Sequence, residues 1–502
     1  MAEQRLLSSI DTLPHALYTV AQVRHFDEVA INTFNIPGYE LMKRAGAAAF
    51  ATLLQQWPSC QTITVMTGLG NNGGDGFVVA KLAIEYGLSV RLLLLGDPSK
   101  IKNDAKSALD DYLAVGGRCD LLDSRASITP ATDVIVDALF GTGLEREIVG
   151  VAEAAIAMMN AHHAPVIALD IASGIHSDTG KVMGCAVAAD VTVSFIGLKQ
   201  GLFTADGCTY SGEIFFDHLK VPAKVYAHEI LSAIRLTPEK SNHLLPPRAA
   251  NSHKGSFGHV LVVGGGAGMG GAVRMAGEAA LRVGAGLVSV ACDASHCSSI
   301  VSARPELMCH GITSASELQP LIDKASVIVV GPGLGLNEWA QTLLDVVLHS
   351  DKPKIVDADA LTLLADLNHT SNNWVLTPHP GEAAILLQQN NAQIQGDRFA
   401  SAEAIRQKFG GVAVLKGAGT IIRVVNKPFY VCDGGNPGMA TAGMGDVLSG
   451  VIAGFIAQGL SNEEAAQLGV SLHAQAGDIA SESGQRGLLA TDLFPILRTL
   501  VG

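Results

Sequence analysis

Two glycine-rich segments of the chain carry polar side chains of the kind that bind nucleotides and move protons. The first, GLGNNGGDG (68–76), follows an apolar run and adds Asn71, Asn72 and Asp75 to what is otherwise a small-residue turn. Backbone N–H groups at a helix start can hold a phosphate, and side-chain oxygens suit hard cations. The G-x-G-x-x-G spacing of a dinucleotide fingerprint occurs at 68–73 but also at 266–271, so a tight turn without a ligand remains an alternative.

Two more polar loops follow apolar runs in the same half of the chain. VDALFGTGL places Asp137 within the run and Gly141 to Gly143 just beyond it, and ALDIASG places Asp170 and Ser173 at the end of another. The carboxyl ends of parallel strands meet at one edge of a sheet, so these loops are expected to converge with Asn72. A buried aspartate that only caps a turn is the alternative for each position alone.

The second segment, NPGMATAGMGDVLSG (436–450), is the most specific signal in the chain. Gly443 to Gly445 precede a helical pattern, so their free N–H groups form an anion hole, and Asp446 lies in the first turn. Phosphoryl transfer needs this combination of donors for the phosphate and a carboxylate for the proton of the attacking hydroxyl. Taken alone, Asp446 could equally be a helix residue favoured by the dipole.

The elements that must position these residues follow an alternating pattern. Apolar strand-like runs alternate with helical patterns from 62 to 174 and again from 259 to 457, which is typical of βαβ units and parallel sheets. Between them, residues 221–253 include Pro222, Pro238, Pro246 and Pro247 and no strand-length apolar run. The sequence therefore predicts two α/β domains, 1–227 and 228–502.

Composition excludes several classes of protein. The 502 residues are 48% hydrophobic with a net charge of −13, which is neither a disordered composition nor that of a nucleic-acid binder. Eight cysteines without a C-x-x-C pair indicate scattered, reduced thiols and no metal cluster. The N-terminus lacks a secretory signal, and the uncharged stretch 255–273 is too rich in glycine to span a membrane. A soluble, cytoplasmic protein is expected.

The motifs of the first half closely resemble those of the NAD(P)H-hydrate epimerase domain. YTVAQVRHFDEVAI (18–31), GYELMKRAG (38–46), GLGNNGGDG, VDALFGTG and LDIASG occur in that order, and the resemblance covers about residues 15–220. It implies a Rossmann-like fold that interconverts the R and S forms of hydrated NAD(P)H. Lys43, where the family often has an acidic residue, departs from the pattern.

This resemblance also implies a set of site residues. Asp170 would lie at the reacting ring and act as acid and base, and Asn72, Asp137 and Ser173 would hold a potassium ion. The hydrated nucleotide would be contacted by two loops and Asp170: Asn71, Asn72, Gly73, Gly74 and Asp75, and Gly141, Thr142, Gly143, Leu144, Glu145, Arg146 and Glu147.

The second half closely resembles the ribokinase-like NAD(P)H-hydrate dehydratase domain, over about residues 230–502. The motifs KIVDADAL, LTPHPGEAAILL, KGAGTII and GGNPGMATAGMGDVLSG carry this resemblance. It implies that an adenine nucleotide, ADP in bacterial-type members, is consumed to remove water from the S-hydrate. Asp446 would be the catalytic base and would face the substrate with Ala272, Gly335 and His379. The nucleotide would contact Lys416, Gly417, Ala418, Gly419, Thr420 and Gly445.

The chemistry fits this resemblance. A hydroxyl deprotonated by Asp446 would attack the terminal phosphoryl group, and the phosphate ester would then leave with help from the ring nitrogen. Mg²⁺ is expected with the nucleotide, and Asp357 and Asp359 are candidate ligands that could equally be structural.

The sequence thus favours a bifunctional repair enzyme acting on NADHX and NADPHX, with a homo-oligomer expected. A ribokinase-superfamily vitamin or sugar kinase with a regulatory nucleotide module is the first alternative. The second is a first domain that only binds a ligand or partner as a scaffold.

Overall fold

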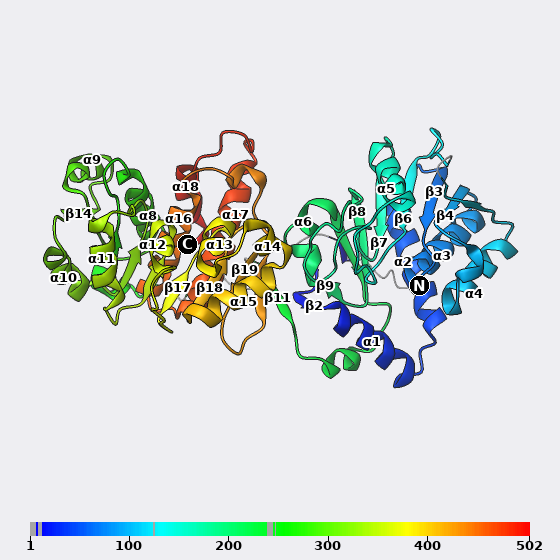
Figure 1. The fold of residues 1–502 in the computed structure, drawn as a ribbon, viewed down its shortest axis with the longest axis horizontal. Helices are drawn as coiled ribbons and strands as arrows, with labels where there is room; N and C mark the ends of the chain where they lie inside the picture. Colours follow the sequence, from blue (N-terminus) through cyan, green and yellow to red (C-terminus); the bar gives the residue numbers. More distant parts are fainter. Residues whose placement is uncertain (1–6, 9–12, 124–125, 238–243, 246) are drawn as a thin grey trace. The chain divides into compact units, whose positions relative to one another are not determined.

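A computed structural model describes residues 7–8, 13–123, 126–237, 244–245 and 247–502. The chain divides into two compact units, Met1–Ile234 and Arg235–Gly502, each with its own sheet (Figure 1). The first six residues and two prolines of the expected linker, Pro238 and Pro246, lie outside the described residues. The assignment of activities to 1–227 and 228–502 stays a prediction.

The first unit is built on a mostly parallel sheet in the order β1-β10-β8-β7-β6-β3-β4-β5. Six of these strands lie side by side in the order β5-β4-β3-β6-β7-β8. Numbered along the chain with β3 as the first, this order is 3-2-1-4-5-6, which is typical of doubly wound folds. Such folds bind ligands where the strand order reverses. That point lies between β3 and β6. The strands are β1 Leu7–Ser8, β3 Thr62–Thr67, β4 Ser89–Leu94, β5 Cys119–Leu121, β6 Val134–Ala138, β7 Val166–Leu169, β8 Val191–Phe195 and β10 Glu213–Asp217.

Both faces of this sheet are covered, as the continuous apolar runs predict. Successive residues of a strand face opposite ways, so Val65 and Val136 join a core with helices α1 to α4, whereas Met66 and Ile135 join one with α5. The helices are α1 Val20–Asn32, α2 Gly38–Gln56, α3 Asn71–Tyr86, α4 Asn103–Ala114, α5 Val151–Ala161 and α6 Gly207–Tyr210. The short strand β2 (Ala16–Tyr18) pairs in parallel with β9 (Leu198–Lys199) and antiparallel with β11 (Ala233–Leu236).

The second unit repeats the plan with a longer sheet, β14-β13-β12-β15-β16-β17-β18-β19-β20. The strands from β14 to β18 are parallel, β19 and β20 add an antiparallel edge, and the order reverses between β12 and β15. The strands are β12 His259–Val263, β13 Leu287–Cys292, β14 Met308–Gly311, β15 Val327–Val330, β16 Lys354–Val356, β17 Trp374–Leu376, β18 Val412–Leu415, β19 Thr420–Arg423 and β20 Phe429–Cys432.

Two glycines allow the central helices of this unit to approach closely. A Cβ on Gly450 of α16 would lie 2.0 Å from the carbonyl oxygen of Ala276 in α8, and one on Gly454 would lie 2.4 Å from Val283. Figure 1 shows α8, α16 and α17 among the helices around the sheet. The helices are α8 Gly270–Arg282, α9 Cys297–Ala303, α10 Ala315–Lys324, α11 Glu338–Leu348, α12 Ala358–Leu364, α13 Pro380–Leu387, α14 Asn391–Gly396, α15 Arg398–Phe409, α16 Met444–Ala457, α17 Asn462–Ser481 and α18 Leu493–Leu500.

Three features differ from the expectations drawn from the sequence. Helix α3 begins at Asn71, so the Asn71–Asp75 segment is a helical first turn, and the proline-rich stretch contains the strand β11. The cysteines are not all scattered, because Cys292, Cys297 and Cys309 gather at one place. Among the described residues, no helix is long and apolar enough to cross a membrane.

Candidate functional sites

A cavity of about 830 Å³ lies at the point of the first unit where the strand order reverses. It is lined by the residues that follow β3 and β6, because those two neighbouring strands end at the same edge and their chains leave in opposite directions. The predicted residues that line it are Asn71, Asn72, Asp75, Gly141, Thr142, Gly143, Leu144, Arg146 and Asp170. The structure therefore brings most of the predicted nucleotide site together.

Four predicted contact residues lie outside the lining of this cavity. Gly73 and Gly74 are buried, and a Cβ there would lie 2.2 Å from the carbonyl oxygen of Gly68 or 2.6 Å from the side chain of Met42. Their small size lets α3 pack against its surroundings. Glu145 and Glu147 are exposed on the outer side of the loop.

The side chain of Asp170 is held by a buried lysine that sequence analysis did not identify. Lys199, at the end of β9, is fully buried, and its ammonium forms an ion pair with Asp170 and donates to Ser194 Oγ at 3.2 Å and to the carbonyl of Phe195 at 3.1 Å. Asp170 itself has a left-handed backbone with φ +66°. This strained conformation at the cavity wall is typical of a functional residue.

Two further carboxylates stand close enough to Asp170 to affect its electrostatics. Burial, the Asp170 charge and the Asp27 charge raise the pKa of Asp75 well above its ordinary value. Burial also raises the pKa of Asp27, on α1, to about 6 despite the opposing effect of Lys199. Three acidic groups thus lie near one buried cation, and two of them, Asp75 and Asp27, have pKa values raised toward or above neutrality.

Of the predicted cation ligands, Asn72 lines the cavity, whereas Asp137 and Ser173 are buried and lie outside its lining. Ser173 Oγ donates to Asp137 Oδ1 at 2.6 Å, the Ser173 amide donates to Asp137 Oδ2 at 2.8 Å, and burial raises the pKa of Asp137 to about 6. The amide of Phe140 donates to Ser173 Oγ at 2.9 Å, and the next residue, Gly141, packs against Asn72. Both polar atoms of the Asn72 side chain are buried without a hydrogen-bond partner. Of these two atoms, Oδ1 is an oxygen of the type that cations bind, and Nδ2 is a hydrogen-bond donor.

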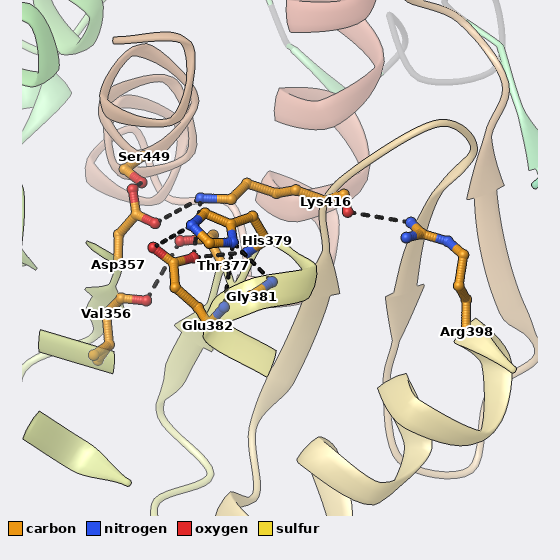
Figure 2. Close-up of polar contacts among 9 residues, drawn as sticks. All are labelled: Val356, Asp357, Thr377, His379, Gly381, Glu382, Arg398, Lys416 and Ser449. Carbon is orange, nitrogen blue, oxygen red and sulfur yellow. Dashed lines mark hydrogen bonds and ion pairs between the residues drawn. The ribbon is translucent and has the colours of Figure 1, made fainter. Parts of the chain in front are cut away.

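The second site is organised around a buried ion pair at the carboxyl edge of the sheet (Figure 2). Lys416, directly after β18, places Nζ 2.8 Å from Asp357 Oδ1 and 3.7 Å from Glu382 Oε2, while Ser449 of α16 donates to Asp357 Oδ2 at 2.6 Å. Burial opposes both charges, but each partner stabilises the other, so the pKa of Asp357 is low and that of Lys416 is high. Lys416 is therefore a fixed cation.

A fully buried arginine forms hydrogen bonds to the backbone of the KGAGT turn. Arg398 Nη2 donates to the carbonyls of Leu415, Lys416 and Gly419 at 3.1, 3.2 and 3.4 Å, opposite to the side from which the Lys416 side chain leaves (Figure 2). Gly417 and Gly419 have positive φ values of +136° and +64°. The turn of Lys416, Gly417, Ala418, Gly419 and Thr420 is thus formed before any nucleotide binds.

Asp446 lies in the first turn of α16, whose N-cap Gly443 has φ +92°. Burial and the neighbouring Asp357 raise the pKa of Asp446 to about 7, against the opposing effect of Lys416. A Cβ on Gly445 would lie 3.1 Å from Lys416 Nζ, so the turn before Asp446 directly abuts the fixed cation. A carboxylate that titrates near neutral pH, next to an anion hole and a lysine, is suited to general-base catalysis of phosphoryl transfer.

The remaining predicted substrate residues are His379 at the N-cap of α13, Ala272 in the first turn of α8, and Gly335 in the loop after β15. His379 caps α13, with Nδ1 accepting from the amides of Gly381 and Glu382 at 3.0 and 3.2 Å, and its side chain is 56% exposed. Ala272 lies 3.2 Å from a Cβ built on Gly333, and Gly335 donates its amide to Asp359 Oδ2 at 2.8 Å. Asp359 in turn raises the pKa of Asp446. The other ring nitrogen of His379, Nε2, lies 3.4 Å from Glu382 Oε1, so the imidazole is engaged within its own cap.

Comparisons with known proteins match both units. Residues 260–499 match the family model described as NAD(P)H-hydrate dehydratase, and residues 38–201 match that of the YjeF-related protein N-terminus. The bifunctional NAD(P)H-hydrate repair enzyme Nnr of Coxiella burnetii is 48% identical over 97% of this chain and 99% of that protein. The chain belongs to the family of bifunctional NAD(P)H-hydrate repair enzymes.

A second member of this repair family and a solved structure are also similar to this chain. The enzyme of Escherichia coli with the same name is 41% identical, covering 100% of this chain and 97% of its own. The crystal structure of a ribokinase-like superfamily protein from Enterococcus faecalis matches 54% of this chain and 96% of its own, with a TM-score of 0.51 and 32% identity. The predicted resemblance to the two domain families and the α/β fold class are confirmed.

Sequence analysis missed the buried charges that hold the predicted residues of this repair family. Lys199 lies in a segment without other charges, VTVSFIGLKQG, and a lysine at such a position is a signal for a paired buried charge. Asp27 and Arg398 lie in ordinary helical patterns, and nothing in the sequence distinguishes them from exposed residues. Only tertiary structure reveals their partners.

Proposed function

We propose that the chain repairs hydrated NAD(P)H, with an epimerase site in the first unit and a nucleotide-dependent dehydratase site in the second. The observation that carries the proposal is the arrangement of Asp446, near-neutral in pKa, beside Gly445 and the Lys416–Asp357 ion pair. Full-length similarity to bifunctional NAD(P)H-hydrate repair enzymes supports it. The proposed division lies at residues 1–227 and 228–502, in a cytoplasmic homo-oligomer.

In the dehydratase site, Asp446 takes the proton of the substrate hydroxyl, and the resulting oxygen attacks the terminal phosphoryl group of ADP. The backbone amides at the start of α16 and the Lys416 ammonium stabilise the charge that develops on the transferred group. The C–O bond to the phosphate then breaks as the ring nitrogen donates its lone pair. Loss of a proton from C5 restores the dihydropyridine ring.

Mg²⁺ bound to the nucleotide phosphates would neutralise part of their charge. Of the two candidate ligands, Asp357 is engaged by Lys416 and Ser449 through both oxygens, whereas Asp359 is engaged by the Gly335 amide through Oδ2. Asp359 therefore fits a role toward the cation, and Asp357 fits one toward Lys416.

In the epimerase site, Asp170 is the acid and base at the ring carbon that carries the hydroxyl. Protonation of the hydroxyl lets it leave as water, the ring nitrogen stabilises the resulting cation, and a water deprotonated on the other face restores the hydroxyl. Lys199 holds the Asp170 carboxylate in place, and Asp75 and Asp27 provide nearby groups that exchange protons. Asn72, Asp137 and Ser173 would hold a potassium ion that fixes the loops around the substrate.

One assay tests this function and its alternatives. Purified protein is supplied with hydrated NADH and either ADP or ATP, and absorbance of the reduced nicotinamide is followed. Repair predicts a nucleotide-dependent rise in absorbance with stoichiometric release of inorganic phosphate from the intermediate. A stable phosphorylated product with no rise would instead support a vitamin or sugar kinase, and faster ADP than ATP turnover would support the bacterial-type cosubstrate.

A further inference from the structure

Three cysteines from separate elements meet at the outer part of the second sheet. Cys292 is the last residue of β13, Cys297 the first of α9, and Cys309 lies in β14. Their sulfur atoms all lie within 4.8 Å of one another, and those of Cys292 and Cys309 are 3.5 Å apart. The parallel pairing of β13 with β14 places Cys309 beside Val290, and a short turn after β13 returns the chain to Cys297.

The sulfur spacing matches shared coordination of a metal ion. A disulfide needs sulfurs at about 2.05 Å. Two thiolates bound tetrahedrally to one Zn²⁺, each at about 2.3 Å, lie about 3.8 Å apart. The observed 3.5 Å between Cys292 and Cys309 is near the second value, and the Cys297 sulfur lies within 4.8 Å of both.

We propose that Cys292, Cys297 and Cys309 form a binding site for a thiophilic d¹⁰ cation such as Zn²⁺, through three thiolates. Thiolate ligands select such ions, and three protein ligands leave a fourth position for water. Two polar side chains of the intervening segment make contacts of their own: Asp293 Oδ1 accepts from Ser295, and His296 Nε2 lies 3.1 Å from both Gly266 O and Gly268 N.

The proposed ion would stabilise the glycine turn after β12, which precedes Ala272, a residue predicted to face the substrate of the proposed dehydratase site. In the turn after β12, the carbonyl oxygen of Gly265 accepts a hydrogen bond from the Asp293 amide at 3.1 Å. Gly266 and Gly268 of the same turn contact the His296 side chain. The segment that makes these contacts begins at Cys292 and ends at Cys297. Fixing both ends of this segment would fix the turn. Metal binding itself does not depend on the proposed function, and only an effect of the ion on catalysis rests on it.

Metal binding is tested on the full chain, reduced and freed of metal with a chelator. Titration with Co²⁺ should give one equivalent bound, with thiolate-to-cobalt charge-transfer absorbance in the near ultraviolet, and Zn²⁺ should displace it. Cys297→Ser should weaken Zn²⁺ binding by about 10–100-fold in competition with a chromophoric chelator. Cys432→Ser, which changes a cysteine remote in sequence at the end of β20, is the matched control and should bind as the wild type does.

A second measurement keeps the proposal testable where a variant folds poorly. A hundredfold excess of Zn²⁺ over its Kd should raise the Tm of the wild type by roughly 5–10 °C and leave that of Cys309→Ala unchanged. Cobalt spectra without charge transfer, equal binding by Cys297→Ser, or a Cys292–Cys309 disulfide under the same reducing conditions would overturn the proposal. The dehydratase assay is run separately, so failure of the repair function is not confused with failure of the metal site.

Discussion

At the scale of single residues, the near-neutral pKa of Asp446 predicts the pH dependence of dehydration. Only the carboxylate form accepts a proton, so with a pKa of about 7 kcat should rise with pH through neutrality and fall about tenfold per unit below it. Asp446→Asn should bind nucleotide normally and lose about 10²–10⁴-fold in kcat. The measurement is kcat from about pH 5.5 to about pH 8.5. A full rate in the asparagine variant would exclude the base assignment.

The buried pair of Lys199 and Asp170 predicts separable effects on activity and stability. Lys199→Met should abolish most epimerisation and also lower the free energy of unfolding by about 3–5 kcal/mol, because it leaves a carboxylate without its partner. Adding Asp170→Asn should restore much of the stability but none of the activity. Urea denaturation and epimer ratios measured by chromatography test both. An active Lys199→Met protein would show that the lysine is not needed at the ring.

Sequence analysis reaches the residues whose role depends on a local motif and misses those whose role depends on distant partners. Asp446 and Lys416 are recognisable because each stands in a glycine turn at a strand or helix end. Arg398 and Asp27 lie in unremarkable helical patterns, and only the packing of separate elements shows what they contact. Three cysteines with spacings outside any familiar motif are missed for the same reason.

At the scale of elements, the contact of α16 with α8 predicts a strong size restriction. Gly450→Ala would place a methyl group 2.0 Å from the Ala276 carbonyl oxygen, so the helices must separate at a cost of about 1–3 kcal/mol. Gly271→Ala on α8 is the matched control, since no atom lies within 4 Å of its Cβ position. The control should leave stability unchanged or raise it slightly. Thermal unfolding followed by circular dichroism decides the matter, and equal effects would refute close packing as the cause.

The loops after β3, β6 and β7 predict dependence on a monovalent cation. Exchange of potassium for a bulky organic cation at constant ionic strength should lower epimerase activity, because the carboxamide of Asn72 loses its ligand. Asp137→Ala should lose most activity together with its cation dependence. Dehydration of pure S-hydrate in the same buffers is the control. Undiminished epimerisation after exhaustive removal of potassium would leave these three residues a structural role only.

Most elements are predictable because their apolar periodicity is strong, and the exceptions have local causes. The α3 helix starts earlier than expected because Asn71 to Gly74, although rich in turn-forming residues, pack tightly against Gly68 and Met42. β11 is only four residues long and lies among prolines, so its pattern is too short to identify. Its place depends on pairing with β2, more than two hundred residues earlier.

At the scale of the whole molecule, the two units predict activities that can be separated. A fragment from about residue 228 to 502 retains all of the second unit, including the buried ion pair of Arg235 with Asp433. It should dehydrate the S form and leave R-hydrate that only slow spontaneous epimerisation clears. Adding the full chain carrying Asp446→Asn should restore consumption of the remainder. Equal consumption of both epimers by the fragment alone would refute a two-site enzyme.

The hydrogen bonds from Arg398 to the KGAGT turn have a consequence for how nucleotide binding responds to temperature. Since the carbonyls of Leu415, Lys416 and Gly419 are already tied to a guanidinium in the core, the conformational entropy of this turn is lost during folding and not when the nucleotide arrives. Nucleotide capture then involves little reorganisation of the turn, and warming the protein does not loosen it before the core itself opens. Binding strength and heat tolerance of the second unit are therefore set by the same guanidinium.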